Sequence, residues 1–259
     1  MEEVIFTDSR GNQVLGTLSI PDNAKWVVII SHGFSSSKES RVYVELQSEL
    51  NALGIGTLRY NYYGHGRLYC KNDKHTVSRD VTLTKCLDSL KAAVSYIRNK
   101  GDYGIGLFGS SFGGLMSLMV ASQNQSIDAL ALKSPVTNPI DFWQQRLGDE
   151  RIIKWKMNKV MYYDECGENF ELNYGFWEDL LIYNTSKMAR GVSCPVLIVH
   201  GGNDTVVPIK QSENLGKIIK TEVNVVKGAN HNYGTIKQHD EMKKLIVGFF
   251  EKNLINKKI

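Results

Sequence analysis

The strongest chemical signal in the sequence is the string Gly-Ser-Ser-Phe-Gly at 109–113. It follows an apolar, strand-like segment at 104–108 and leads into an apolar, helix-like segment at 112–123. A strand-to-helix turn of this kind forces its central residue into a strained conformation, and small neighbours let the turn close. We therefore predict that Ser111 presents its hydroxyl as a nucleophile at the carboxyl end of a sheet. A glycine-rich turn without a catalytic role is the alternative.

A serine hydroxyl needs a base to accept its proton, and His231 is the best placed of the six histidines. It lies in a loop between the last predicted strand and a C-terminal helix, and functional sites concentrate in such loops. Asp204, just after the strand predicted at 195–199, can fix the imidazole tautomer and stabilise its protonated form. The chain order serine, acid, histidine matches hydrolases that carry this nucleophile motif. The alternative assigns Asp204 to a helix cap and His231 to a turn.

Two backbone N–H groups are candidates for binding the negative charge that develops on a substrate carbonyl oxygen. One belongs to Phe112, directly after Ser111. The other comes from the loop at 31–34 (Ser-His-Gly-Phe), where Gly33 permits a tight turn and Phe34 is the expected donor. Because these donors are main-chain groups, the side chain of Phe34 remains available to line a pocket.

The pattern of apolar residues predicts the elements that must hold these groups. Strands are predicted at 4–8, 14–20, 26–30, 55–60, 104–108, 128–132, 195–199 and 222–226. Helices are predicted at about 38–53, 78–99, 112–123 and 208–219, and from about 236 onward. Strands and helices alternate after a first hairpin, so we predict an α/β fold with a mostly parallel sheet wrapped by helices on both sides.

The alternation breaks between about Val136 and Arg190, where we expect no strand and predict an insertion of helices above the sheet. This segment holds ten of the chain's 25 aromatic residues and three of its four tryptophans. Two interpretations stay open: the rings seal the insertion onto the core, or a subset roofs an apolar acyl or aryl pocket over Ser111. The candidates for substrate contact are Phe34, Trp143, Tyr162, Tyr163, Phe176 and Trp177.

The composition excludes several classes of function. A chain of 259 residues, 42% of them hydrophobic, can bury a sizeable core without disulfides or metal ions. A formal net charge of +4 is too small to imply a nucleic-acid partner, and no apolar run approaches the ~18 residues of a membrane span. The four cysteines lie far apart, no pair of ligands has metal spacing, and we do not expect the acidic start to be a secretory signal. We expect no metal, no cofactor and a cytoplasmic location.

Taken together, the Gly-x-Ser-x-Gly string, Asp204, His231 and two short motifs resemble the α/β-hydrolase superfamily over essentially the whole chain. The two motifs are His32-Gly33-Phe34 and Gly64-His65-Gly66. Within the superfamily, the chain is similar to the esterase branch of cinnamoyl (feruloyl) esterases and monoacylglycerol lipases, described broadly as serine aminopeptidase-like hydrolases. The resemblance implies one domain over 1–259, an eight-stranded, mostly parallel sheet, and a cap inserted after the sixth strand at about 136–190. It also implies a catalytic triad of Ser111, Asp204 and His231, with oxyanion donors at Phe34 and Phe112.

These observations predict a serine esterase that cleaves a small-molecule carboxylic ester through an acyl-enzyme on Ser111. An aryl or medium-chain acyl ester is the expected substrate. A peptidase or aminopeptidase, or a thioesterase, can use the same triad. An aminopeptidase needs a carboxylate to bind the substrate amine, and the candidates are Glu165, Glu168, Glu171 and Asp179. A hydrolase-fold binding protein without turnover has no need of a complete triad. The sequence leaves the oligomeric state open, a homodimer included.

Overall fold

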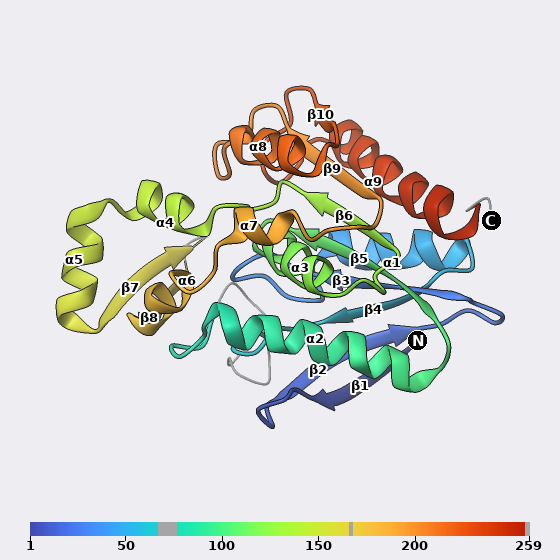
Figure 1. Ribbon diagram of the computed structural model, residues 1–259, viewed down its shortest axis with the longest axis horizontal. Helices are drawn as coiled ribbons and strands as arrows, with labels where there is room; N and C mark the ends of the chain where they lie inside the picture. The colour runs from blue at the N-terminus through green and yellow to red at the C-terminus, as the bar shows by residue number, and fades with distance from the viewer. Residues whose placement is uncertain (67–76, 166–167, 257–259) are drawn as a thin grey trace.

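The central element is an eight-stranded sheet, seen in a computed structural model that describes residues 1–66, 77–165 and 168–256 (Figure 1). Its strand order is β1-β2-β4-β3-β5-β6-β9-β10. The strands are β1 (Glu2–Thr7), β2 (Gln13–Ser19), β3 (Trp26–Ser31), β4 (Gly56–Tyr60), β5 (Gly104–Ser110), β6 (Ala129–Lys133), β9 (Val196–Gly201) and β10 (Val223–Val226). β2 pairs antiparallel with β1 and β4, and the other neighbours are parallel. The predicted mostly parallel, eight-stranded sheet is confirmed.

Helices cover both faces of this sheet, because its central strands are apolar on both sides. The helices are α1 (Arg41–Ala52), α2 (Leu83–Lys100), α3 (Phe112–Gln123), α8 (Ile209–Ile219), α9 (Ile236–Phe250) and a short π-helix, η1 (Glu251–Ile255). In β3, Val27 and Ile29 pack into the core that includes α2, α3 and α8. Val28 and Ile30 pack into the opposite core, with α1 and α9. The continuous apolar run that predicted this strand therefore fills two cores at once.

The largest shift of a predicted helix end is at α2, which begins at Leu83 rather than near Ser78. Thr82 has an extended backbone, and its hydroxyl accepts the Lys85 N–H at 3.2 Å, so it caps the helix. The apolar spacing that suggested the helix runs through the correct residues, but the cap fixes where the helix starts.

The segment between β6 and β9, here called the insert (residues 134–195), departs from the expectation that it holds no strand. It contains α4 (Pro139–Leu147), α5 (Asp149–Asn158), β7 (Val160–Glu165), β8 (Glu168–Asn173), α6 (Gly175–Leu180) and α7 (Thr185–Ala189). β7 and β8 form an antiparallel hairpin, which lies with α5 to one side of the main sheet, at the left of Figure 1. Met161 and Tyr163 on one strand and Phe170 and Leu172 on the other are buried, so every second side chain faces the core. The prediction of a purely helical insertion was wrong.

A group of partly buried hydrogen bonds connects the insert to the start of α2. Asp179 accepts both the backbone N–H and the hydroxyl of Thr84, each at 2.6 Å, and the Tyr183 hydroxyl lies 2.6 Å from the same threonine. Arg79 reaches Asn173 at 2.8 Å and Glu171 at 3.2 Å. A carboxylate at the N-terminus of α2 also complements the helix dipole. These contacts fix the position of the insert relative to α2.

Candidate active site

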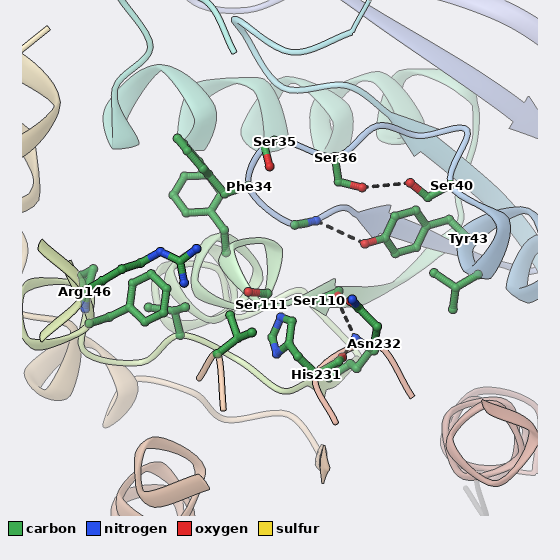
Figure 2. A pocket seen from close by; sticks show the side chains of 18 of the residues that line it. Phe34, Ser35, Ser36, Ser40, Tyr43, Ser110, Ser111, Arg146, His231 and Asn232 are labelled. Carbon is green, nitrogen blue, oxygen red and sulfur yellow. Dashed lines mark hydrogen bonds between the residues drawn. The ribbon is translucent and has the colours of Figure 1, made fainter. Parts of the chain in front are cut away.

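Ser111 sits at the turn between β5 and α3 with a backbone φ of +53°. Such a conformation costs a non-glycine residue on the order of 1–3 kcal/mol, so neighbouring contacts must impose it. Its N–H donates to the Lys133 carbonyl at 2.9 Å, and its own carbonyl accepts the N–H of Gly114 at 3.0 Å and of Val136 at 3.1 Å. The hydroxyl faces the cavity described below (Figure 2).

The glycines on both sides of Ser111 are required by close backbone approaches. A Cβ on Gly109 would lie 2.2 Å from the Gly113 carbonyl oxygen. A Cβ on Gly113 would lie 2.3 Å from the carbonyl oxygen of Ser31, at the end of β3. The first helical turn of α3 therefore packs directly against the neighbouring strand end, which brings the loop after β3 beside Ser111.

His231 and Asp204 meet although 27 residues separate them in the chain. The His231 Nδ1 lies 2.7 Å from Asp204 Oδ2, and the other carboxylate oxygen accepts the N–H groups of Val206 and Val207 at 2.9 Å. His200 Nε2 lies 3.4 Å from the same Oδ2, and the Asp204 side chain is fully buried. Burial alone would raise the pKa of the Asp204 carboxyl, but the hydrogen bonds from His200 and His231 hold that pKa far below its usual range.

The opposite influences on His231 leave a neutral imidazole at neutral pH. Burial lowers the pKa of His231 most strongly, and the nearby Lys133 cation lowers it further. The Asp204 carboxylate opposes both effects. The net pKa lies below the ordinary value of 6.5. With Nδ1–H donating to Asp204, a neutral ring leaves Nε2 free to accept a proton.

The Phe34 and Phe112 N–H groups lie on the two backbone segments that flank Ser111. Phe112 is the first residue of α3, so its N–H has no acceptor within the helix. Neither N–H donates to another group in the part of the chain that the structure describes. A Cβ on Gly33 would lie 3.7 Å from the Cβ of Ser111, which measures how closely the Phe34 loop approaches it.

Two buried histidines lie beside the Phe34 loop, and the His65 ring centroid is 5.7 Å from that of Phe34. His32 Nδ1 donates to the Gly33 carbonyl at 2.7 Å, and its Nε2 accepts the Tyr62 N–H at 3.4 Å. His65 Nδ1 donates to the Tyr63 carbonyl at 3.1 Å. Burial lowers the pKa of His65 to about 4 and that of His32 well below its usual range, so both rings are neutral at pH 7.

Ser111 and His231 share one cavity of about 530 Å³ with two different walls (Figure 2). The wall toward the insert is mainly apolar and aromatic: Phe34, Val136, Phe142, Trp143, Tyr163 and Val206. The wall toward α1 and α9 is mainly polar: Ser35, Ser36, Ser40, Tyr43, Asn232 and His239. The cavity has the size and the mixed lining of a small-molecule site.

Three of the six residues predicted to contact substrate line the cavity, and three do not. Phe34, Trp143 and Tyr163 line the cavity. Phe176 is fully buried behind them, with its ring 5.5 Å from Phe34, and Trp177 is also buried outside the lining. Tyr162 is 69% exposed, because strand alternation turns it away when Tyr163 faces inward. These last three are not among the described residues that touch the cavity.

Sequence comparison decides the family. The model of a protein family described as "Serine aminopeptidase, S33" matches residues 22–167, more than half of the chain. The chain belongs to this family. The matched part of this S33-family hydrolase includes Ser111 and the loop of Phe34, whereas Asp204 and His231 follow it in the chain.

Several known proteins are similar to this S33-family hydrolase. A protein of Acanthamoeba polyphaga mimivirus, whose name places it among the α/β hydrolases, is 25% identical over 219 residues, which are 81% of this chain and 68% of that protein. The structure of Est1E from Butyrivibrio proteoclasticus superposes with a TM-score of 0.78 at 26% identity, covering 98% of this chain and 99% of that one. The same protein with ferulic acid bound gives 0.78 at 27% identity, covering 96% and 100%. These similarities establish the α/β-hydrolase fold of the chain and show that its structural neighbours include esterases.

Three charged residues that the sequence interpretation did not assign to the site are among those that line the cavity of this hydrolase: Lys133, Arg146 and Asp164. Arg146 hydrogen-bonds the Tyr163 hydroxyl, and its guanidinium lies 5.9 Å from the Phe142 ring centroid. A single lysine ending the apolar strand Ala-Leu-Ala-Leu-Lys was a signal that could have indicated Lys133. Within the described residues no group of histidine, cysteine and acidic side chains has the geometry to hold a metal ion. No helix of that part of the chain is long and apolar enough to cross a membrane.

Proposed function

We propose that the protein is a serine carboxylesterase whose nucleophile is Ser111. One observation carries the proposal: the buried Asp204–His231 pair opens into the same cavity as a serine held at a strained strand-to-helix turn. A serine, a histidine and a carboxylate from three separate loops at one cavity are the parts that acyl transfer needs.

In the proposed reaction, Ser111 Oγ attacks the ester carbonyl while His231 Nε2 accepts the hydroxyl proton. The negative charge on the former carbonyl oxygen is bound by the N–H groups of Phe34 and Phe112. His231 then gives its proton to the departing alcohol, which leaves an acyl group on Ser111. A water molecule, activated by the same imidazole, releases the carboxylic acid and restores the serine. Asp204 keeps the imidazole oriented and stabilises it while it is positively charged.

The two walls of the cavity support an aryl or medium-chain acyl ester as substrate. The aromatic wall offers Phe34, Trp143 and Tyr163 to an apolar acyl group. The hydroxyl-rich wall lies beside His231, where the alcohol must depart. The similarity to a protein that binds ferulic acid, an aryl acid, favours the same assignment. We also propose that the insert acts as a cap over this site, within a single domain of residues 1–259.

A second candidate, an aminopeptidase, is favoured by Asp164, which is among the residues that line the cavity. The carboxylates first considered for this role are differently placed. Asp179 binds Thr84, and Glu171 pairs with Arg79. The side chains of Glu165 and Glu168 lie outside the described residues. The family description names an aminopeptidase as well, so Asp164 is the group on which the two functions can be separated. Thioesterase chemistry and a cytoplasmic location stay predictions.

The decisive experiment combines active-site labelling with two substrates. A fluorophosphonate probe should label the wild-type protein and fail to label Ser111→Ala, which should also lose ester turnover by at least ~1,000-fold while remaining folded by circular dichroism. Ser110→Ala, one position away, is the matched control and should retain labelling. Turnover in Ser111→Ala near that of the wild type would reject the proposal. Efficient cleavage of aminoacyl-nitroanilides, lost in Asp164→Asn, would replace the esterase with the aminopeptidase.

A further inference from the structure

Lys133 is a buried lysine that the reaction above does not use. It contacts the chain both at Ser110–Ser111 and at His231. Its Nζ donates to the His231 carbonyl oxygen at 2.8 Å and lies 3.4 Å from Ser110 Oγ. Its own main-chain carbonyl accepts the Ser111 N–H at 2.9 Å. The residue is the last of β6 and is paired in register with Ser110 of β5. One residue thus connects the backbone of the nucleophile to the backbone of the base.

Burying an ammonium group at this position carries a free-energy cost. Transfer of a charge from water to a protein interior is unfavourable unless it is paired, and an apolar side chain would fit the same strand without that penalty. The Nζ lies over the Tyr233 ring at 4.9 Å from the centroid, which offsets part of the penalty. Burial still lowers the pKa of Lys133 to about 8, although the Asp204 carboxylate opposes the shift. Lys133 therefore remains mainly protonated at pH 7.

We propose, on the basis of the proposed esterase function, that Lys133 is a positioning residue: its ammonium fixes the His231 loop through the backbone carbonyl and places a positive charge beside the imidazole. The hydrogen bond restrains where the ring stands relative to Ser111. The charge disfavours a resting imidazolium, so His231 is kept in the neutral form that can accept the serine proton. The two effects come from one group and can be measured separately.

The direction of the charge effect follows from the groups that face His231. Asp204 after β9 binds the imidazole Nδ1, and Lys133 in β6 binds the main-chain carbonyl of His231. His200 in β9 contacts Asp204, and the Tyr233 ring lies against the Lys133 ammonium. Asp204 raises the pKa of His231, whereas the Lys133 charge lowers it. A lower pKa keeps the neutral base populated at lower pH. Removal of the Lys133 charge must therefore raise the pKa of His231 and move the acid limb of activity to higher pH.

The test compares kcat and the pH profile of kcat/KM on a nitrophenyl ester for three variants. Lys133→Met keeps the length of the side chain but removes both the donor and the charge. It should lower kcat about 5- to 10-fold and raise the pKa of the acid limb by about 0.5 to 1 unit. Lys133→Arg keeps the charge and should leave that pKa at the wild-type value. Lys227→Met removes a charge from an exposed site on the loop before His231 and is the matched control, with no change expected in either quantity.

The outcomes separate a positioning role from a merely structural one. A lower kcat in Lys133→Met with an unmoved acid limb, or wild-type values for both, overturns the proposal. Should Lys133→Met not fold, Lys133→Gln, which keeps a donor but no charge, must still raise the acid-limb pKa. Fluorophosphonate labelling of the wild type tests the esterase itself. A wild type without labelling or turnover rejects the proposed function, whereas an active wild type with an unmoved limb in the charge-removing variants rejects only the role of Lys133.

Discussion

Two regions of the molecule meet at the cavity, and they are specified in different ways. On the sheet side, backbone contacts set the geometry: Ser111 binds the Lys133 carbonyl, and Gly113 leaves no room for a Cβ against Ser31. On the insert side, the residues that line the cavity are mainly apolar and aromatic. Four rings of the insert (Trp143, Tyr163, Phe170 and Phe176) pack against one another and against the Phe34 ring from the loop after β3, with centroids 5.1 to 6.5 Å apart.

This difference predicts different consequences of mutation. A backbone-determined site has one arrangement, so a change there removes a chemical step. A wall of packed rings can rearrange by small rotations and still enclose a ligand, so a change there alters binding and stability. Sheet-side variants should therefore lower kcat, and insert variants should act through KM and the free energy of unfolding. The same substitution made in both regions is the most direct comparison.

The largest effect is expected for Asp204→Asn on the sheet side. The amide keeps the shape of the carboxylate, but it cannot stabilise the imidazolium and it favours the wrong imidazole tautomer. We expect kcat on a nitrophenyl ester to fall about 1,000- to 10,000-fold with KM changed less than about threefold. Steady-state kinetics and circular dichroism measure both points. A loss of kcat below tenfold would remove Asp204 from the catalytic assignment.

An intermediate effect is expected for the same change in the insert, Asp179→Asn. The amide can accept only one of the two hydrogen bonds from Thr84 without rotation, which loosens the insert from α2. We expect the free energy of unfolding to fall by about 1–2 kcal/mol and KM to rise several-fold, with kcat near that of the wild type. Urea denaturation and steady-state kinetics test this. Thr84→Val, which deletes the hydroxyl partner of Asp179, should give similar changes in the free energy of unfolding and in KM. A fall in kcat as large as that of Asp204→Asn would contradict the proposed difference between the two regions.

The sheet side was also the more predictable from the sequence. A Gly-x-Ser-x-Gly string between a strand and a helix leaves few conformations, and each glycine at 109 and 113 proves to be in backbone contact. Asp204 and His231 could be placed because parallel strands end at one edge of the sheet. Lys133 was missed because its role depends on a contact 98 residues away in the chain, which no local pattern encodes.

The insert was less predictable because its local signals conflict. Met-Tyr-Tyr-Asp at 161–164 places two aromatic residues in a row and hides the period of two that marks a strand. The alternation of a strand is clear only in the second strand of the hairpin, β8, where Phe170 and Leu172 face inward. The anchor of Asp179 on Thr84 joins residues 95 positions apart. Which aromatic rings line the cavity depends on such contacts, so Trp143 and Phe176 could not be distinguished beforehand.

The smallest predicted effect uses the neighbouring tyrosines of β7 to test side-chain direction within the insert. Tyr163 lines the cavity and its hydroxyl accepts a hydrogen bond from Arg146, whereas Tyr162 is exposed on the opposite face of the hairpin. Tyr163→Phe removes that acceptor but keeps the ring, so KM for an aryl ester should change about two- to fivefold with kcat unchanged. Tyr162→Phe makes the identical chemical change and should leave KM at the wild-type value. Equal shifts in the two variants would mean that the wall does not contact the substrate through the inward face of β7, and that the insert acts on the site only by covering it.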